Sequence, residues 1–427
     1  MSARIAVIGT GYVGLTTGVC LAHLGHTVVC ADVDAAKVAR LAAGEMPIVE
    51  DGLAELLTEG LASGRLSFVV GAATAAANCE IAFLCVPTPQ GDDGSADLSY
   101  IEAASAEIGP VLPAGAIVVN KSTVPVGSAR SVEAVIRRDD IRVVSNPEFL
   151  REGSALRDFM HPDRVVVGAD DRSAAERVAA LYASLEAPTI ITDPASAETI
   201  KYAANAFLAT KLSFVNAIAA ICEGVGANVD DVIEGIGSDT RIGASFLQPG
   251  PGWGGSCFGK DSRALIRIAQ GAGYEFDLLS GVITVNDQQH DRMAHKVASA
   301  VGGSLTGRTV AVWGLTFKAG TDDLRESPAV AVITRLITAG ARVVAHDPTV
   351  STPRFGVPDG LVLAASPLAA CNGADVLCVL TEWPEYRAVP AIDVAAALTT
   401  PRVVDTRNLL DRAAWVAAGF TYDGVGR

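Results

Sequence analysis

The feature that most constrains this chain is a glycine-rich turn close to its start. The motif Gly9-Thr-Gly11-Tyr-Val-Gly14 follows an apolar run, Arg4-Ile-Ala-Val-Ile-Gly9, and opens a helical pattern that extends from about Gly14 to His23. A short apolar run of this kind is typical of a buried parallel strand. Between a strand and a helix, such glycines permit a tight turn, close approach of a pyrophosphate and close helix packing. The motif therefore predicts a strand–turn–helix unit that binds a dinucleotide.

An acidic residue ends the next predicted strand, Thr27-Val-Val-Cys-Ala-Asp32. A carboxylate at this distance from the glycine turn accepts hydrogen bonds from the adenosine ribose and repels a 2′-phosphate. The N–H groups at the start of the intervening helix are donors for the phosphates. A glycine triplet alone can be a chance turn, but together with Asp32 it predicts NAD in preference to NADP.

The C-terminal part of the chain repeats this strand pattern. Thr309-Val-Ala-Val-Trp-Gly314 resembles the first strand, and Arg342-Val-Val-Ala-His-Asp347 resembles the second, again with a terminal Asp. Ala374–Thr381 and Val403–Thr406 supply further strand candidates. The glycine triplet is absent after Trp313, so we expect this second α/β domain to bind a different ligand.

The two patterned parts are separated by a helical middle. Residues 196 to about 223 contain neither Pro nor Gly and predict one long helix. A chain of 427 residues is too long for a single domain with one hydrophobic core. We therefore expect an α/β chain with two Rossmann-like doubly wound domains joined by a central helical domain. The predicted boundaries are 1–195 for the NAD domain, 196–300 for the central helical domain and 301–427 for the second α/β domain.

The charge and cysteine patterns exclude several classes of function. The net charge is −15 and no Lys/Arg cluster occurs, which argues against a nucleic-acid or acidic-membrane partner. The eight cysteines include no Cys-x-x-Cys pair, so we expect free thiols in a reducing cytoplasm and no metal site. The N-terminal run lacks the features of a signal peptide, and we expect a soluble, cytoplasmic protein.

One cysteine has an unusual sequence context. Gly254-Gly-Ser-Cys-Phe-Gly-Lys-Asp261 places a thiol, a cation and a carboxylate within a few residues of a predicted flexible loop. A cysteine is most often a small buried hydrophobe. For Cys257, the glycines allow close approach of a ligand and Lys260 favours a thiolate, so a catalytic role is the alternative.

Two further pairs are spaced by four residues. Lys201 and Asn205 share one face of the predicted long helix, among small and apolar neighbours. Such a pair is usually solvated, but a buried lysine there could stabilise an oxyanion. Glu148 and Glu152 follow Pro147, which suits a helix start, so they are either helix-start charges or active-site acids.

These motifs together resemble the UDP-glucose/GDP-mannose dehydrogenase family over nearly the whole chain. The matching stretches are Gly9–Gly14, Cys85–Pro89, Lys121–Gly127, Asn146–Glu152, Lys201–Asn205, Gly254–Asp261, Phe317–Pro328 and Asp405–Arg407. The resemblance implies an N-terminal NAD domain, a homodimer formed through the central helix and a C-terminal UDP-binding domain. It also implies oxidation of a nucleotide-sugar alcohol at C6 to a carboxylate by two molecules of NAD.

The resemblance assigns catalytic roles to seven residues. Asp261 and Lys201 assist loss of the alcohol proton, and Cys257 captures the aldehyde as a thiohemiacetal that becomes a thioester. Lys201 and Asn205 stabilise the oxyanion. Thr123 and Glu148 or Glu152 position the hydrolytic water.

The resemblance also implies two sets of ligand contacts. For NAD they are Gly9, Gly11, Tyr12, Val13, Gly14, Asp32, Lys37, Pro87, Thr88, Ser122, Thr123, Glu152, Lys260 and Arg325. For the sugar nucleotide they are Glu148, Phe149, Leu150, Lys201, Asn205, Arg241, Phe246, Gly254, Cys257, Phe317, Lys318 and Arg407, with Arg241 assigned to the neighbouring subunit's site.

The substrate prediction has alternatives. The Gly252–Cys257 context favours UDP-glucose, while GDP-mannose and UDP-N-acetylmannosamine remain rivals for the same chemistry. A catalytically silent dinucleotide-binding regulator is a rival of another class, against which the intact set of catalytic candidates argues. One position departs from the family pattern: Gly259 stands where Pro is usual, which predicts a less preorganised segment around Cys257.

Overall fold

The computed structural model describes residues 2–91 and 96–427 and divides into two compact units. Unit 1 comprises residues 1–204 and 263–273, and unit 2 comprises residues 205–262 and 274–427. Two helices, α9 (Pro194–Val225) and α11 (Gly255–Gly271), contribute residues to both units. The three-domain boundaries given above stay a prediction.

Unit 1 contains an eight-stranded sheet in the order β3-β2-β1-β4-β5-β6-β7-β8. The first six strands are parallel, in the order expected of a dinucleotide-binding sheet, and β7 and β8 run antiparallel to them. The strands are β1 (Arg4–Ile8), β2 (Thr27–Asp32), β3 (Leu66–Val70), β4 (Ile81–Leu84), β5 (Ile117–Asn120), β6 (Arg142–Ser145), β7 (Val165–Gly168) and β8 (Thr189–Thr192).

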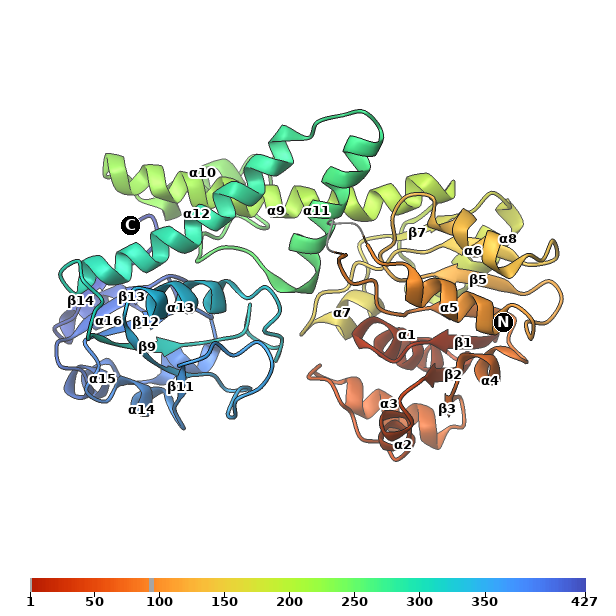
Figure 1. Ribbon diagram of the computed structural model, residues 1–427, viewed down its shortest axis with the longest axis horizontal. Coiled ribbons are helices and arrows are strands. Elements are labelled where there is room, and N and C mark those ends of the chain that lie inside the picture. The colour runs from red at the N-terminus through yellow and green to blue at the C-terminus, as the bar shows by residue number, and fades with distance from the viewer. Residues whose placement is uncertain (1, 92–95) are drawn as a thin grey trace. The chain divides into compact units, whose positions relative to one another are not determined.

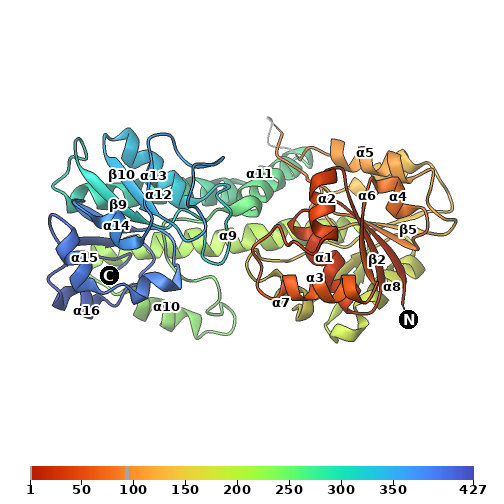
Figure 2. The ribbon, with the colours of Figure 1, turned by 90° about the horizontal axis from the view of Figure 1, so that it is seen from below.

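Helices cover both faces of this sheet. Because side chains alternate along a strand, Ile5 and Val7 join a core beneath α1, α3, α7 and α8, whereas Ala6 and Ile8 join a core beneath α4, α5 and α6. Figure 2 shows α4 and α5 on one side of the strands and α3 and α8 on the other. The helices are α1 (Tyr12–His23), α2 (Ala35–Ala42), α3 (Leu53–Ala62), α4 (Ala72–Ala76), α5 (Ser99–Ile108), α6 (Ser128–Ile136), α7 (Ala155–Met160), α8 (Arg172–Ala179) and the 3₁₀ turn η1 (Ala180–Leu185).

Unit 2 repeats this architecture with a six-stranded parallel sheet, β11-β10-β9-β12-β13-β14. Helices α12 and α13 pack on one face and α14, α15 and α16 on the other. Figure 1 shows α12 and α13 on one side of β9 and α14 and α15 on the other. The strands are β9 (Thr309–Trp313), β10 (Arg342–His346), β11 (Val362–Leu363), β12 (Val376–Val379), β13 (Arg402–Asp405) and β14 (Thr421–Asp423). The helices are α10 (Val229–Gly237), α12 (Asp277–Ala300), α13 (Pro328–Thr338), α14 (Pro367–Cys371), α15 (Ala391–Ala397), α16 (Arg412–Ala417) and the turn η2 (Pro384–Ala388).

The two sheets correspond down to the turn after their first strand. The Gly9 N–H donates to Ala31 O and the Gly314 N–H donates to His346 O, both at 2.8 Å, and both glycines have φ of +96°. The acid that ends each second strand, Asp32 or Asp347, accepts hydrogen bonds from the turn. The predicted α/β fold with two related domains and a long connecting helix is therefore confirmed.

Among the described residues, one helix is long and apolar enough to cross a membrane by length and composition alone. This is α9, and 44% of its most apolar window is buried inside the structure. A core helix passes the same test. Lys201, Ser213 and Asn216 lie buried along α9, each with partners from the protein interior.

Two local predictions are wrong. Gly255 to Gly259 form the start of α11 and not a flexible loop. Pro147 does not begin a helix, because the segment from Asn146 to Arg151 has no regular secondary structure and α7 starts later, at Ala155.

Candidate active site

The glycine turn has the shape of a pyrophosphate cradle. A Cβ added to Gly9 would lie 2.6 Å from Cys85 O, and one added to Gly14 would lie 1.9 Å from Gly9 O, so both positions require glycine. At Gly11, by contrast, an added Cβ would have no atom of the described residues within 4 Å apart from its chain neighbours. Gly11 is the N-cap of α1 and offers no side-chain cap to the first turn, which includes Tyr12 and Val13. The open space and the available N–H groups fit a dinucleotide phosphate.

Asp32 is held as a carboxylate beside this turn. Its Oδ2 accepts hydrogen bonds from the Thr10 N–H at 3.0 Å, the Thr10 hydroxyl at 2.5 Å and Lys37 Nζ at 3.0 Å. Burial alone would raise the pKa of Asp32, but these bonds and one from the Asp34 N–H outweigh it and lower the pKa to about 2. The structure thus brings Asp32 and Lys37 together at the predicted adenosine-ribose position.

Tyr12 connects the glycine turn to the segment that carries Glu148 and Glu152. Its hydroxyl bonds to the Glu50 carboxylate and accepts the Gly153 N–H at 2.6 Å. Burial, and then Glu50, raise the pKa of Tyr12 above its ordinary value. The phenol therefore stays neutral and acts as a fixed link between the two segments.

The loops after β4 and β5 lie side by side at the carboxyl edge of the sheet. Thr88 Oγ1 donates to Thr123 O at 2.9 Å, and Ser122 Oγ donates to Val86 O at 2.7 Å. These bonds bring the predicted residues Pro87, Thr88, Ser122 and Thr123 to one place. Ligands of open α/β sheets bind at this edge.

Lys201 is buried, as its sequence context suggested, and it forms an ion pair with Glu148. Lys201 Nζ lies 2.8 Å from Glu148 Oε1, and the other carboxylate oxygen accepts the Leu150 N–H at 2.6 Å. The Phe149 ring lies beneath two cations, with its centroid 5.5 Å from Lys201 Nζ and 3.6 Å from the Arg164 guanidinium carbon. A buried ion pair is tolerated because each charge is matched in this way.

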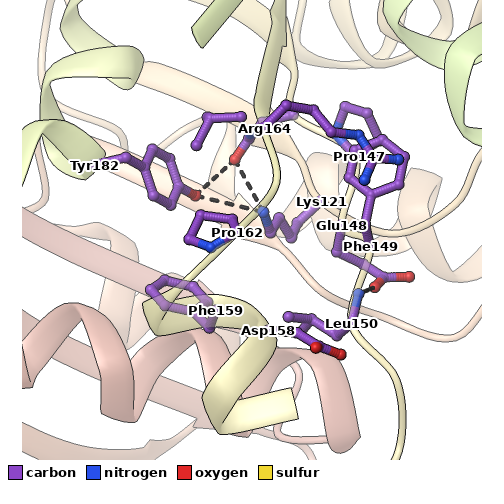
Figure 3. A pocket seen from close by; sticks show the side chains of 12 residues that line it. Lys121, Pro147, Glu148, Phe149, Leu150, Asp158, Phe159, Pro162, Arg164 and Tyr182 are labelled. Atoms are coloured by element: carbon purple, nitrogen blue, oxygen red, sulfur yellow. Dashed lines mark hydrogen bonds between the residues drawn. The ribbon is translucent and has the colours of Figure 1, made fainter. Parts of the chain in front are cut away.

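A small cavity beside Glu148 contains groups that the sequence interpretation did not select as site residues (Figure 3). Lys121 Nζ donates to Asn146 Oδ1 at 3.1 Å, and the Tyr182 hydroxyl donates to the same oxygen at 2.7 Å. Burial lowers the pKa of Lys121 to about 8, although Glu148 opposes the shift. The cavity, of about 40 Å³, has room for water and not for a sugar nucleotide. The sequence signal that could have pointed to this cavity is Lys121, a lysine directly after the apolar run 117–120.

Unit 2 presents Cys257 at the start of a helix. Cys257 is the third residue of α11 and is partly exposed, whereas the other seven cysteines are buried. A Cβ on Gly254 would lie 1.9 Å from Glu326 O, so the chain enters the helix in close contact with unit 2 backbone. The N–H groups of a first helical turn stabilise negative charge, and this favours the thiolate of Cys257.

Asp261 lies one turn further along α11 and is fully buried. Lys260 Nζ lies 2.7 Å from its Oδ1, and Asn205 Nδ2 donates to its Oδ2 at 2.6 Å. Both carboxylate oxygens therefore have a fixed partner. The structure brings Asn205, Lys260 and Asp261 together as one polar cluster.

Three other predicted substrate residues follow strands of the second sheet: Phe317 and Lys318 after β9, and Arg407 after β13. Arg407 follows β13 and donates to Leu380 O at 2.8 Å and to Phe317 O at 3.0 Å. Lys318 Nζ lies 5.5 Å from the Phe317 ring centroid, and Phe246 packs against Phe258 with 6.4 Å between ring centroids.

Two predicted arginines pair with a near neighbour in sequence. Arg325 pairs with Asp323, and Arg241 pairs with Asp239. The Arg241 side chain is 87% exposed and faces solvent.

The predicted residues thus form two sets, one in each unit. Unit 1 contains the glycine turn, Asp32, the Thr123 loop, Glu148 and Lys201, and unit 2 contains Asn205, Asp261 and the predicted sugar-nucleotide contacts from Arg241 to Arg407, including Cys257. Within residues 2–91 and 96–427, no three His, Cys, Asp or Glu side chains gather as a metal site would require.

Comparison with known proteins shows to which family the chain belongs. Models of the UDP-glucose/GDP-mannose dehydrogenase family match residues 3–186 (NAD binding domain), 195–288 (central domain) and 311–412 (UDP binding domain). The chain belongs to this family. The resemblance drawn from the motifs and the predicted NAD-binding N-terminal domain are therefore confirmed.

This family member has full-length relatives of known activity. It is 46% identical to a UDP-glucose 6-dehydrogenase of Rhizobium meliloti, with 99% of each chain covered. A UDP-glucose dehydrogenase structure from Pyrobaculum islandicum superposes with a TM-score of 0.91 at 39% identity, covering 100% of this chain and 98% of that one. A UDP-D-ManNAc dehydrogenase from Pyrococcus horikoshii gives 0.89 at 27% identity, with 99% of each covered.

Proposed function

We propose that this enzyme oxidises the C6 alcohol of UDP-glucose to the carboxylate of UDP-glucuronate through a covalent adduct of Cys257. The observation that carries the proposal is the arrangement at the start of α11. Cys257 presents a partly exposed thiol in the first turn of this helix. One turn later lies the buried carboxylate of Asp261, whose two oxygens are bonded to Lys260 and Asn205. Identities of 43–46% to UDP-glucose 6-dehydrogenases over 99% of the chain support the choice of substrate.

The first oxidation removes a hydride and a proton from the alcohol. NAD, when bound, accepts one hydride in each oxidation. Asp261, with Lys201 and an ordered water, takes up the hydroxyl proton. The buried partners of Asp261 and Lys201 hold these groups in fixed positions before the substrate arrives, which is the condition for efficient proton transfer.

Cys257 then captures the aldehyde. Its thiolate forms a C–S bond to C6, and the carbonyl oxygen becomes an oxyanion that Lys201 and Asn205 stabilise until it is protonated. Loss of a second hydride and of the hydroxyl proton converts this thiohemiacetal to a thioester. Covalent capture thus makes the aldehyde carbon a hydride donor again.

Hydrolysis releases the product. Water oriented by Thr123 and by Glu148 or Glu152 adds to the thioester carbonyl, the C–S bond breaks, and the thiolate and the uronate separate. Two NADH form for each sugar, and no aldehyde leaves the enzyme.

We propose that the chain acts as a cytoplasmic homodimer formed through α9, with the three domains divided as 1–195, 196–300 and 301–427. Phe207, Phe214 and Ile221 are 65%, 52% and 57% exposed and recur every seven residues, so they form one apolar stripe on this helix. Monomeric proteins seldom leave such a stripe in water. Arg241, whose side chain faces solvent, is assigned to the partner's substrate site.

Sugar-nucleotide specificity is tested by an NADH assay with UDP-glucose, UDP-galactose, GDP-mannose and UDP-N-acetylmannosamine. We expect kcat/KM to be highest for UDP-glucose. The structural likeness to the Pyrococcus horikoshii enzyme makes UDP-N-acetylmannosamine the second candidate. A preference for any sugar nucleotide but UDP-glucose contradicts the assignment, and no turnover of any of them would favour the silent regulator.

A further inference from the structure

The segment from Gly250 to Trp253, directly before the helix of Cys257, is fixed by amide side chains of two other helices. Its residues belong to unit 2 and are largely buried. The Gly250 N–H donates to Asn216 Oδ1 of α9 at 2.8 Å, and Gly250 O accepts from Gln289 Nε2 of α12 at 2.7 Å. Both backbone groups of Gly250 are therefore bonded to side chains.

Trp253 is held in the same way. Its N–H donates to Asn286 Oδ1 at 2.8 Å, and its carbonyl accepts from Asn286 Nδ2 at 3.0 Å. One side chain thus satisfies both backbone groups of Trp253, an arrangement that a carboxamide can make and a carboxylate cannot. We call Asn286 and Gln289, three residues apart on α12, the α12 amide pair.

The indole of Trp253 adds a third attachment. Its Nε1 donates to Ser213 Oγ of α9 at 2.8 Å, and the Ser213 hydroxyl donates to Val282 O of α12 at 2.8 Å. The ring packs edge-on against Phe258, the residue after Cys257, with 6.3 Å between ring centroids. The attachment therefore extends from α9 and α12 to the first turn of α11.

The residues between this attachment and Cys257 are Gly254, Gly255 and Ser256. Gly254 and Gly255 have little conformational preference of their own, and Gly259, within the helix, does not restrict the backbone either. The direction in which α11 begins must therefore be imposed from outside. The α12 amide pair supplies three of the hydrogen bonds that fix the preceding backbone, and Asn216 supplies a fourth.

We propose that Asn286 and Gln289 are positioning residues that set the orientation of the Cys257 thiol by fixing the backbone from Gly250 to Trp253. Neither residue needs to contact substrate or cofactor for this effect. Since a misplacement of about 1 Å can slow a reaction on the order of 100-fold, a loosened segment slows aldehyde capture. It leaves unchanged the glycine turn and Asp32 of unit 1, which supply most of the predicted cofactor contacts.

The test compares Asn286→Ala and Gln289→Met in the full-length enzyme with Gln288→Met as the matched control. Gln288 lies next to Gln289 on α12 and is exposed. Each variant is assayed for kcat, KM for NAD, NADH formed per UDP-glucose consumed and aldehyde trapped by semicarbazide. We expect kcat to fall at least 10-fold, KM for NAD to stay within 2-fold, and fewer than two NADH per sugar because aldehyde escapes. The control should form two NADH per sugar without trapped aldehyde.

Two additions separate positioning from a general loss of stability. Asn286→Asp keeps an acceptor for the Trp253 N–H. When the two variants are folded to the same extent, Asn286→Asp should lose less activity than Asn286→Ala. If Asn286→Ala does not fold, Asn286→Asp and Gln289→Met carry the test. Two NADH per sugar at unchanged kcat in these variants would overturn the inference.

The inference rests on the proposed role of Cys257, so Cys257→Ser is assayed in parallel. If Cys257→Ser still forms uronate, the proposed function fails independently of the α12 amide pair. Positioning is then decided by the rate at which iodoacetamide alkylates Cys257, measured by peptide mass. We expect at least a 3-fold decrease in Asn286→Ala and none in Gln288→Met, and an unchanged or higher rate in Asn286→Ala contradicts the inference.

Discussion

Lys201 and Glu148 form a buried ion pair with a distance of 2.8 Å between Nζ and Oε1 and side chains that are 4% and 5% exposed. The pair connects α9 to the irregular segment after β6. Removal of one partner leaves the other charge buried without its main counter-ion. Replacement of both removes that penalty, so the double variant should regain stability without regaining catalysis.

We expect Lys201→Ala to lower the free energy of unfolding by about 3–5 kcal/mol, because an uncompensated buried carboxylate is costly. The double variant Lys201→Met/Glu148→Gln should recover most of that stability and stay catalytically inactive. Urea denaturation and the NADH assay measure the two properties. Activity in the double variant would show that Lys201 has no part in the chemistry.

Cys257→Ala should abolish uronate formation while leaving the fold intact, because the residue is partly exposed and makes up little of the core. We expect kcat for acid formation to fall roughly 1000-fold or more, as for loss of other covalent nucleophiles. Cys222→Ala, in the buried core of unit 2, serves as a comparison that should retain acid formation. Near-normal turnover by the Cys257 variant would show the assignment to be wrong.

Asp32→Asn should weaken NAD binding on the order of 10-fold, since a charge-assisted hydrogen bond to the ribose is lost. KM for NAD from initial rates checks this, and KM for UDP-glucose should change little. An unchanged KM for NAD would remove Asp32 from the cofactor site.

The same residue predicts a pH dependence of stability. Asp32 has a folded-state pKa of about 2 against an ordinary value of 3.8, so its ionised form stabilises the fold above about pH 4. This contribution is lost as the pH falls from about 4 to about 2. The stability difference between the parent enzyme and Asp32→Asn should shrink over that interval in denaturation measured at successive pH values.

Lys121 should make the stability of the fold depend on pH in the alkaline range. Burial lowers its pKa from 10.5 to about 8, so the folded state is penalised by the charged amine at neutral pH, and the penalty disappears as the pH rises from 8 to 10.5. The stability of the parent enzyme relative to Lys121→Met should therefore increase across that interval. A difference independent of pH would mean that Lys121 is not buried as described.

Phe214→Glu should convert the proposed dimer to a monomer, because a carboxylate in the centre of the α9 stripe cannot be buried against a second copy. Analytical ultracentrifugation measures the change. Phe355→Glu is the control, since Phe355 is 97% exposed and lies outside the stripe. A dimer that survives Phe214→Glu would place the interface elsewhere.

The sequence predicted several strands whose ends are marked by a glycine or an acid, but not β3, β7, β8, β11 or β14. The predicted strand Thr27–Asp32 agrees with β2, and Arg4–Gly9 agrees with β1 apart from its final glycine, since each apolar run ends at an acid or a glycine. Glycine and strand-end acids also located the turn after β1. Local patterns of this kind depend on neighbours in sequence, so they need no tertiary information.

The errors arose where side chains, several of them distant in sequence, determine the backbone. The N–H groups expected to start a helix after Pro147 are bonded to side chains instead: Leu150 to Glu148, Arg151 to Asp158, and Gly153 to Tyr12. The glycines before Cys257 enter a helix because they fit against Glu326 and Phe317, which are far away in sequence. Lys121 meets Tyr182 across 61 residues, and no spacing rule predicts that contact.

Asp347 occupies in the second sheet the place that Asp32 has in the first. Its Oδ2 accepts the Leu315 N–H at 2.8 Å, as Asp32 accepts that of Thr10, but it also accepts the Trp383 indole N–H at 3.1 Å. An acid at the end of the second strand therefore stabilises the turn after the first strand, whether or not it also contacts a ligand. The remaining acceptor capacity of Asp347 is occupied by the protein, because its Oδ1 accepts from Thr349 and its Oδ2 from the Trp383 indole. Three glycines introduced after Trp313 would therefore reproduce the glycine motif without freeing Asp347 to accept from a ribose.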